Sequence, residues 1–147
     1  MLTVLTGTTG GRSFLEFAFD SGDQDLQFIS GNTTTIVVRN PLTGAITTLT
    51  GTGFTYDANL DLVGGTLTGW TTRNGANEVI VAVTGISWGA MAFGDAIDQA
   101  FDHDNEGPLN ALFSLQDGTI DARNSLDQIS LIADGITSNV TFLGSDN

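Results

Sequence analysis

The chain has 147 residues, 40% of them hydrophobic, and it carries 17 acidic but only four basic residues, for a net charge of −13. Nucleic acid and anionic membrane surfaces both bind basic patches, so this charge excludes them as partners. There is no cysteine, which excludes disulfides, thiolate metal sites and cysteine nucleophiles. No stretch approaches the roughly 18 apolar residues of a membrane-spanning helix, so membrane insertion is not expected.

The N-terminal part of the chain predicts strands separated by polar turns. Leu2–Thr6 alternates and is expected to be a short edge strand, and Ser13–Phe19 predicts another strand. The β-branched segment Thr33–Arg39 is expected to form a hairpin with Ala45–Thr50 through the Asn40–Gly44 turn.

The segment Gly51–Trp70 predicts a second hairpin. Phe54–Tyr56 and Thr66–Trp70 alternate in polarity, and an acidic, glycine-closed turn lies between them. Glu78–Thr84 follows, and it is apolar enough to be a central strand.

Between residues 87 and 115 the apolar spacing changes to three and four residues, which predicts helices. The first is expected from Ser87 or Trp88 to Asp102, and the second from Pro108 to Leu115, since proline suits a first helical turn.

The tail returns to short β-like segments at Thr119–Ile120, Gln128–Ile132 and Asn139–Leu143. We therefore expect a single, mainly β domain over residues 1–147, a β-sandwich or β-roll of about eight to ten strands. Its parts are β-hairpins at 1–86, a helical insertion at 87–115 and C-terminal β segments at 116–147.

The order of segments from Thr33 to Asp121, including G-T-G-F-T-Y-D-A-N, G-G-T-L-T-G-W and E-V-I-V-A-V-T-G-I-S-W, resembles a known kind of domain. It is the non-repeat domain of RTX (hemolysin-type) secreted calcium-binding proteins of alphaproteobacteria. The resemblance implies an exported, acidic, non-enzymatic surface or matrix protein. The glycine-rich nonapeptides of that class are lacking at Asp117–Asp127, so calcium binding of the repeat type is in doubt.

Two acidic segments are candidate Ca²⁺ sites, because Ca²⁺ takes six to eight oxygen ligands. The first is the turn with Asp57, Asn59 and Asp61, which is otherwise ordinary turn chemistry. The second comprises Asp98, Asp102, Asp104 and Glu106, which otherwise form a solvated helix end. Neither has a carboxylate at the twelfth loop position, so neither is an EF-hand.

No catalytic motif is present, and the protein is expected not to be an enzyme. The single histidine, His103, lies in an acidic loop, and the turn with Asp20, Asp23 and Asp25 is expected to be solvated. Trp70 and Trp88 belong either to the core or to a surface that stacks on a glycan or contacts another subunit.

These observations predict an extracellular structural protein, a surface, matrix or fibre subunit exported without a recognisable N-terminal signal peptide. Self-association is expected through exposed terminal strands, Leu2–Thr6 and Asn139–Leu143, with Ca²⁺ as a candidate cofactor that stiffens the acidic turns. The alternatives are a glycan- or protein-binding adhesin module and a virion accessory or tail-fibre protein.

Overall fold

The computed structural model describes residues 1–6, 14–121 and 139–143. The described strands are β1 (Leu2–Thr6), β2 (Gln27–Gly31), β3 (Thr35–Arg39), β4 (Ile46–Tyr56), β5 (Leu62–Arg73), β6 (Val79–Thr84), β7 (Trp88–Gly89), β8 (Gly118–Asp121) and β9 (Val140–Leu143). The described helices are α1 (Phe14–Phe19), α2 (Ala90–Asp102) and α3 (Gly107–Phe113).

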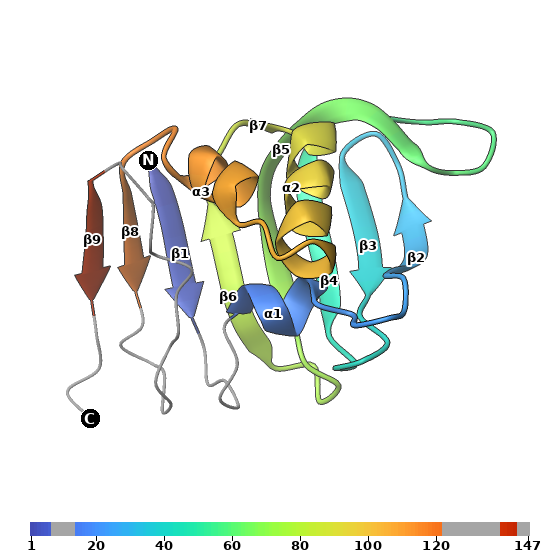
Figure 1. Ribbon diagram of the computed structural model, residues 1–147, viewed down its shortest axis with the longest axis horizontal. Coiled ribbons are helices and arrows are strands. Elements are labelled where there is room, and N and C mark those ends of the chain that lie inside the picture. The colour runs from blue at the N-terminus through green and yellow to red at the C-terminus, as the bar shows by residue number, and fades with distance from the viewer. Residues whose placement is uncertain (7–13, 122–138, 144–147) are drawn as a thin grey trace.

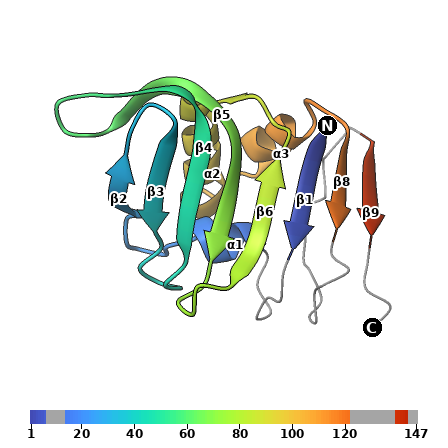
Figure 2. The same cartoon turned by 180° about the vertical axis from the view of Figure 1, so that it is seen from behind.

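All of these strands belong to one sheet, in the order β2-β3-β4-β5-β6-β1-β8-β9, with β7 paired to β5. Neighbours from β2 to β1 are antiparallel, whereas β1, β8 and β9 are parallel to one another. Figure 1 shows the three helices on one face of the sheet, and Figure 2 shows the opposite side. The predicted mainly β class with short helices is confirmed, and helices form the layer that covers the sheet.

We call the side of the sheet away from the helices the open face. Its residues are those that alternate with the buried ones along each strand, among them Thr3, Val37, Thr48, Thr71 and Thr84, and all of these are partly or fully exposed. Within the described residues, no helix or other strand lies over this face (Figure 2).

The predicted hairpin around Gly51–Trp70 is confirmed as the long pair β4 and β5, which is in register from Ile46–Arg73 to Tyr56–Leu62 with three irregularities. Phe54 is buried, and its ring lies against Gly51 and Gly65. Gly65 has a φ of +123°, and a Cβ there would lie 2.6 Å from the Phe54 ring. Glycine at this position therefore lets the ring close over the backbone of the hairpin.

The strand predicted at Ser13–Phe19 is wrong: the described residues form helix α1. Leu15, Ala18 and Phe19, at positions i, i+3 and i+4, are the buried residues of this helix. A short segment in which nearly every residue is apolar satisfies both periodicities, so its pattern does not separate strand from helix. Packing against α2 and the sheet decides in favour of the helix.

The two predicted helices between residues 87 and 115 are confirmed as α2 and α3. Their buried side chains meet Trp70 and Trp88 in an aromatic cluster: Trp70 lies 5.1 Å from Phe93, and Trp88 lies 5.1 Å from Phe113, between ring centroids. This cluster forms the centre of the core between sheet and helices.

The predicted central strand Glu78–Thr84 is confirmed as β6, between β5 and β1. The prediction that Leu2–Thr6 is an edge strand is wrong, because β1 pairs with β6 on one side and with β8 on the other. The strand predicted at Gln128–Ile132 lies outside the described residues. Asn139–Leu143 is represented by β9, the last strand in the described order of the sheet.

A fully buried amide, that of Asn40, connects the β3–β4 turn to the end of α1. Its Nδ2 donates to the carbonyl oxygens of Phe17 and Asp20 at 3.1 and 2.9 Å, and its Oδ1 accepts from the Leu42 N–H at 2.9 Å. These bonds satisfy backbone groups that neither a helix nor a strand satisfies. They also fix the start of the acidic loop that follows α1.

Candidate interaction and cation sites

The turn between β4 and β5 is closed by its own first carboxylate. Asp57 Oδ1 accepts from the backbone N–H groups of Asn59 and Asp61 at 2.8 and 3.1 Å, and the Asp57 N–H donates to the Asp61 carbonyl at 3.0 Å. Leu60 adopts a φ of 65° within the turn. These bonds are those of an Asx-type turn, the alternative that the sequence also allowed. They use one carboxylate oxygen of Asp57, which is one of the three residues predicted to bind Ca²⁺.

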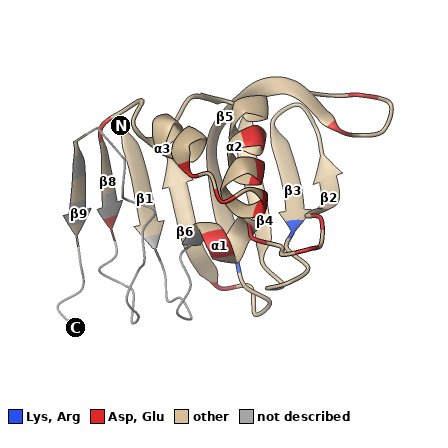
Figure 3. Ribbon diagram, viewed as in Figure 1, with Lys and Arg blue, Asp and Glu red and all other residues tan. Residues whose placement is uncertain are grey.

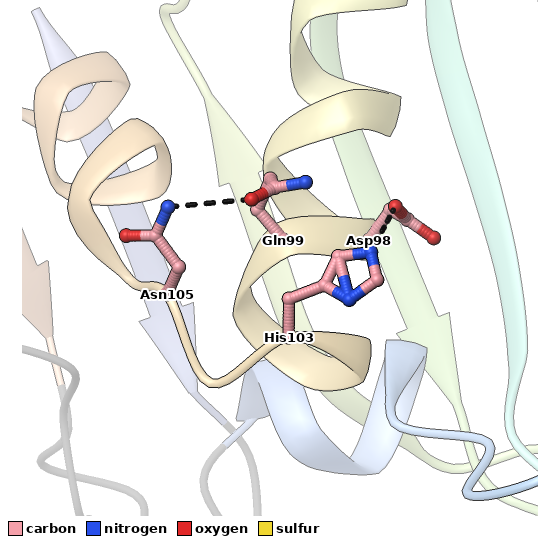
Figure 4. A network of polar contacts seen from close by, with 4 residues as sticks. All are labelled: Asp98, Gln99, His103 and Asn105. Atoms are coloured by element: carbon pink, nitrogen blue, oxygen red, sulfur yellow. Dashed lines mark hydrogen bonds and ion pairs between the residues drawn. The ribbon is translucent and has the colours of Figure 1, made fainter.

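The acidic residues of the second candidate site lie at the C-terminal end of α2 and in the connection to α3. Figure 3 shows acidic residues along α2. His103 Nε2 lies 3.6 Å from Asp98 Oδ2, with both side chains 56% exposed. Figure 4 shows this contact beside the bond from Asn105 Nδ2 to Gln99 Oε1, which is 3.3 Å long and joins the connection to α2.

Asp98 and Asp102, four residues apart on α2, interact directly. A hydrogen bond with Asp98 is the main cause that raises the pKa of Asp102 above its ordinary value of 3.8, and burial and the charge of Asp98 act in the same direction. The charge of His103 acts in the opposite direction. A hydrogen bond between two carboxyl groups requires a shared proton, so the pair favours one negative charge over two.

The loop after α1 lies beside this pair and brings further acidic residues to it. A depression of about 210 Å³ is bordered by Gln24 and Asp25 from the loop and by Asp98 and Asp102 from α2. A neighbouring one of about 400 Å³ is bordered by Asp23, Asp25 and Asp102. The structure thus places the third acidic turn of the sequence next to the second candidate site, a proximity that residue spacing did not indicate.

Within the described residues, neither Asp104 nor Glu106 forms a hydrogen bond or ion pair with Asp98 or Asp102. Within residues 1–6, 14–121 and 139–143, no group of three or more acidic or histidine side chains is arranged to hold a metal ion. The described part of the chain therefore offers a pair of carboxylates near an acidic loop, and no preformed cage of ligands.

Trp70 and Trp88 are each only 1% exposed. Trp88 Nε1 donates to Gln116 Oε1 at 2.9 Å, and Gln116 Nε2 donates to the Leu112 and Phe113 carbonyls at the end of α3. Both rings lie in the aromatic cluster of the core. The interpretation of these residues as a stacking surface for a glycan or a subunit is thus corrected, because neither ring reaches the surface.

The two end strands of the described sheet have a feature in common: neither contains a charged residue or a proline. β2 has the sequence Q-F-I-S-G and β9 has the sequence V-T-F-L. All five residues of β2 are exposed, with Phe28 at 43% and Ile29 at 54%. Sequence analysis did not identify β2 as an edge, because its sequence lacks the charged residues and proline that usually mark one.

The described residues contain no helix that is long and apolar enough to cross a membrane. Comparison of the chain with protein-family models, with curated proteins and with solved structures found no match.

Proposed function

We propose that this protein is a non-enzymatic structural subunit that associates with copies of itself through the ends of its β-sheet. The single observation that carries this proposal is the pair of uncharged end strands, β2 and β9, at opposite ends of the described sheet (Figure 1). An edge strand presents backbone N–H and C=O groups that can pair with another chain.

Soluble proteins usually protect such edges with lysine, proline or short, strongly twisted strands. This chain has no lysine at all, since its four basic residues are arginines. β2 is short, with five residues, but the exposed side chains of Phe28 and Ile29 add apolar surface to its edge. The composition and the placement of these residues both support an edge that is kept available for pairing.

The proposed setting is extracellular, at a cell surface or in a matrix or fibre. The resemblance of residues 33–121 to the non-repeat domain of RTX proteins supports this setting, as does the acidic, cysteine-free composition. Calcium enters the proposal as a counterion that lowers repulsion between subunits of net charge −13. In this role the acidic loop 20–25 and α2 attract cations without a closed coordination sphere.

Sedimentation velocity over a range of protein concentrations, with electron microscopy of the concentrated sample, tests the proposal. We expect reversible growth of oligomers in the unmodified protein. Ile29→Lys places a charge on β2 and should raise the dissociation constant about tenfold, equivalent to about 1.4 kcal/mol. Met91→Lys is the matched control, because Met91 is an exposed apolar residue of α2, and it should assemble like the unmodified protein.

A protein that stays monomeric at every concentration would contradict the proposal. Equal weakening by Ile29→Lys and Met91→Lys would also contradict it, because the effect would then not be specific to the sheet edge.

A further inference from the structure

We propose that the contact between copies is heterologous: β2 of one copy pairs, antiparallel, with β9 of the next, so that the sheet continues from copy to copy. This inference rests on the proposed function and names the surfaces that meet. A contact of this kind does not close on itself after two subunits, so repeated addition builds a filament, or a ring if the rotation between copies closes.

Strand directions are compatible with this contact. Five antiparallel steps lead from β2 through β3, β4, β5 and β6 to β1, and β8 and β9 then run parallel to β1. An odd number of reversals makes β2 antiparallel to β9, as the arrows in Figure 1 show. A copy shifted along the sheet therefore presents its β2 to the β9 of its neighbour as an antiparallel pair, with the helices of both copies on the same side.

The charge around the edges favours the mixed contact over the pairing of two β2 strands. The acidic loop with Asp20, Asp23 and Asp25 leads directly into β2. The β4–β5 hairpin also lies beside this strand, because Tyr56 contacts Phe28 and donates to the Asn32 carbonyl at 2.7 Å, and its turn carries Asp57 and Asp61. Two β2 edges brought together would bring two such groups of five carboxylates together, whereas the acidic residues next to β9 within the described part of the chain are Asp117, which accepts from the Asn139 N–H, and Asp121, the register partner of Leu143.

The β2 strand has an irregularity between Phe28 and Ser30, where its register with β3 shifts. Such a bulge disturbs the regular spacing of the outward backbone groups. We therefore expect a weak, concentration-dependent contact, in keeping with a reversible polymer.

Crosslinking tests the contact, and the absence of cysteine from the chain makes it specific. Ser30→Cys lies on β2 and Thr141→Cys on β9, and both residues are exposed. Their register partners Val37 and Thr119 place both on the open face, so the introduced thiols can meet across a junction. A short bis-maleimide reagent also reaches diagonal neighbours, about 7–8 Å apart in an antiparallel pair. Met91→Cys, on α2, is the exposed control.

We expect crosslinked dimers when the Ser30→Cys and Thr141→Cys proteins are mixed, and not when either is treated alone. The protein with both substitutions should give a ladder of trimers and larger species. Crosslinking of Ser30→Cys with itself would overturn the proposal in favour of a two-fold contact between β2 strands. Crosslinking of Met91→Cys to the same extent would overturn it as random collision.

Two results separate this inference from the proposed function. If the unmodified protein sediments as oligomers but no mixture crosslinks beyond the Met91→Cys control, the β2–β9 contact is wrong and self-association stands. If the unmodified protein sediments only as a monomer, both fail.

Discussion

Thr47 and Thr72 are a pair of buried threonines whose hydroxyl groups interact across two neighbouring strands. They face each other on β4 and β5, are both fully buried, and share a hydrogen bond of 2.9 Å between their hydroxyl groups. Thr47→Val or Thr72→Val alone leaves one buried hydroxyl without its partner, so each should reduce the free energy of unfolding by about 1–3 kcal/mol. The double valine variant should be nearly as stable as the unmodified protein, because both polar groups are then gone.

The adjacent pair Thr48 and Thr71 provides the control for this double-mutant cycle. It is in register on the same strands but lies on the open face, where both residues are partly exposed. Valine substitutions there should have small, additive effects on the free energy of unfolding measured in urea. Additive losses at Thr47 and Thr72 would show that the hydroxyl pair is not a coupled unit.

The sequence alone does not decide whether Trp70 and Trp88 lie in the core or at the surface. Their positions near the ends of strands left both a core and a surface role open, and only burial distinguishes these roles. Trp88 N–H has Gln116 as its acceptor, whereas Trp70 N–H has no acceptor among the described residues. The glutamine that caps α3 lies 28 positions after Trp88, and no local pattern connects the two.

Among the elements, helix α2 has an unfavourable distribution of charge at its C-terminal end. Asp98 and Asp102 lie in its last turns, no basic residue is present in the last turn, and the helix dipole places partial negative charge there. Asp98 and Asp102 are like charges four residues apart near the C-terminus of the helix. Removal of one of them should increase the free energy of unfolding by roughly 0.5–1 kcal/mol at neutral pH. We therefore expect Asp102→Asn to increase the melting temperature at pH 7.

The pH dependence of this effect follows from the raised pKa of Asp102. The folded protein holds the shared proton more tightly than the unfolded chain does, so the pair contributes stability below the ordinary pKa of 3.8 and loses it as pH rises through the raised value. The gain from Asp102→Asn should therefore be absent below the ordinary pKa of 3.8 and develop as pH rises through the raised pKa of Asp102. Asp61→Asn changes the net charge equally at an exposed turn, and an equal gain there would contradict the explanation.

The elements that the sequence predicted correctly are those with an unambiguous period or a clear turn. β4 and β5 flank a turn rich in Asp and Asn, β6 is β-branched and apolar, and α2 has a three- and four-residue apolar spacing over 13 residues. Helix α1 has only six residues, nearly all apolar, and its contacts with α2 and with Asn40 decide its conformation. The edges of the sheet were assigned wrongly for β1 because strand order depends on pairing between segments distant in sequence, such as Leu2–Thr6 with β8.

The candidate sites were predictable only as local groups of acidic residues. The sequence placed Asp98 and Asp102 on one helix face, which the structure confirms, since both residues border the same depression beside α2. It did not indicate that the loop with Asp23 and Asp25 lies beside that face. That arrangement depends on the long-range bonds from Asn40 to the end of α1, 20 and 23 positions away, and these are set by the tertiary fold.

Over the whole molecule, charge opposes the association that the sheet edges favour. Acidic residues lie along α2, in the loop after α1 and at the tip of the β4–β5 hairpin (Figure 3), so copies repel one another at long range. Between about 0.01 M and 0.15 M salt the screening length falls from about 30 Å to about 8 Å. We therefore expect self-association to strengthen several-fold over this range, measured by sedimentation velocity at constant protein concentration.

The same experiment with divalent cations separates screening from coordination. If Ca²⁺ acts as a counterion, as proposed, Ca²⁺ and Mg²⁺ at equal ionic strength should promote association equally, and Asp61→Asn and Asp102→Asn should reduce the effect of both to the same small extent. Mg²⁺ requires a tighter octahedral geometry than Ca²⁺, so a coordinated site would distinguish the two ions. An increase in association that only Ca²⁺ produces, and that a chelator reverses, would contradict the counterion role and show a selective calcium site.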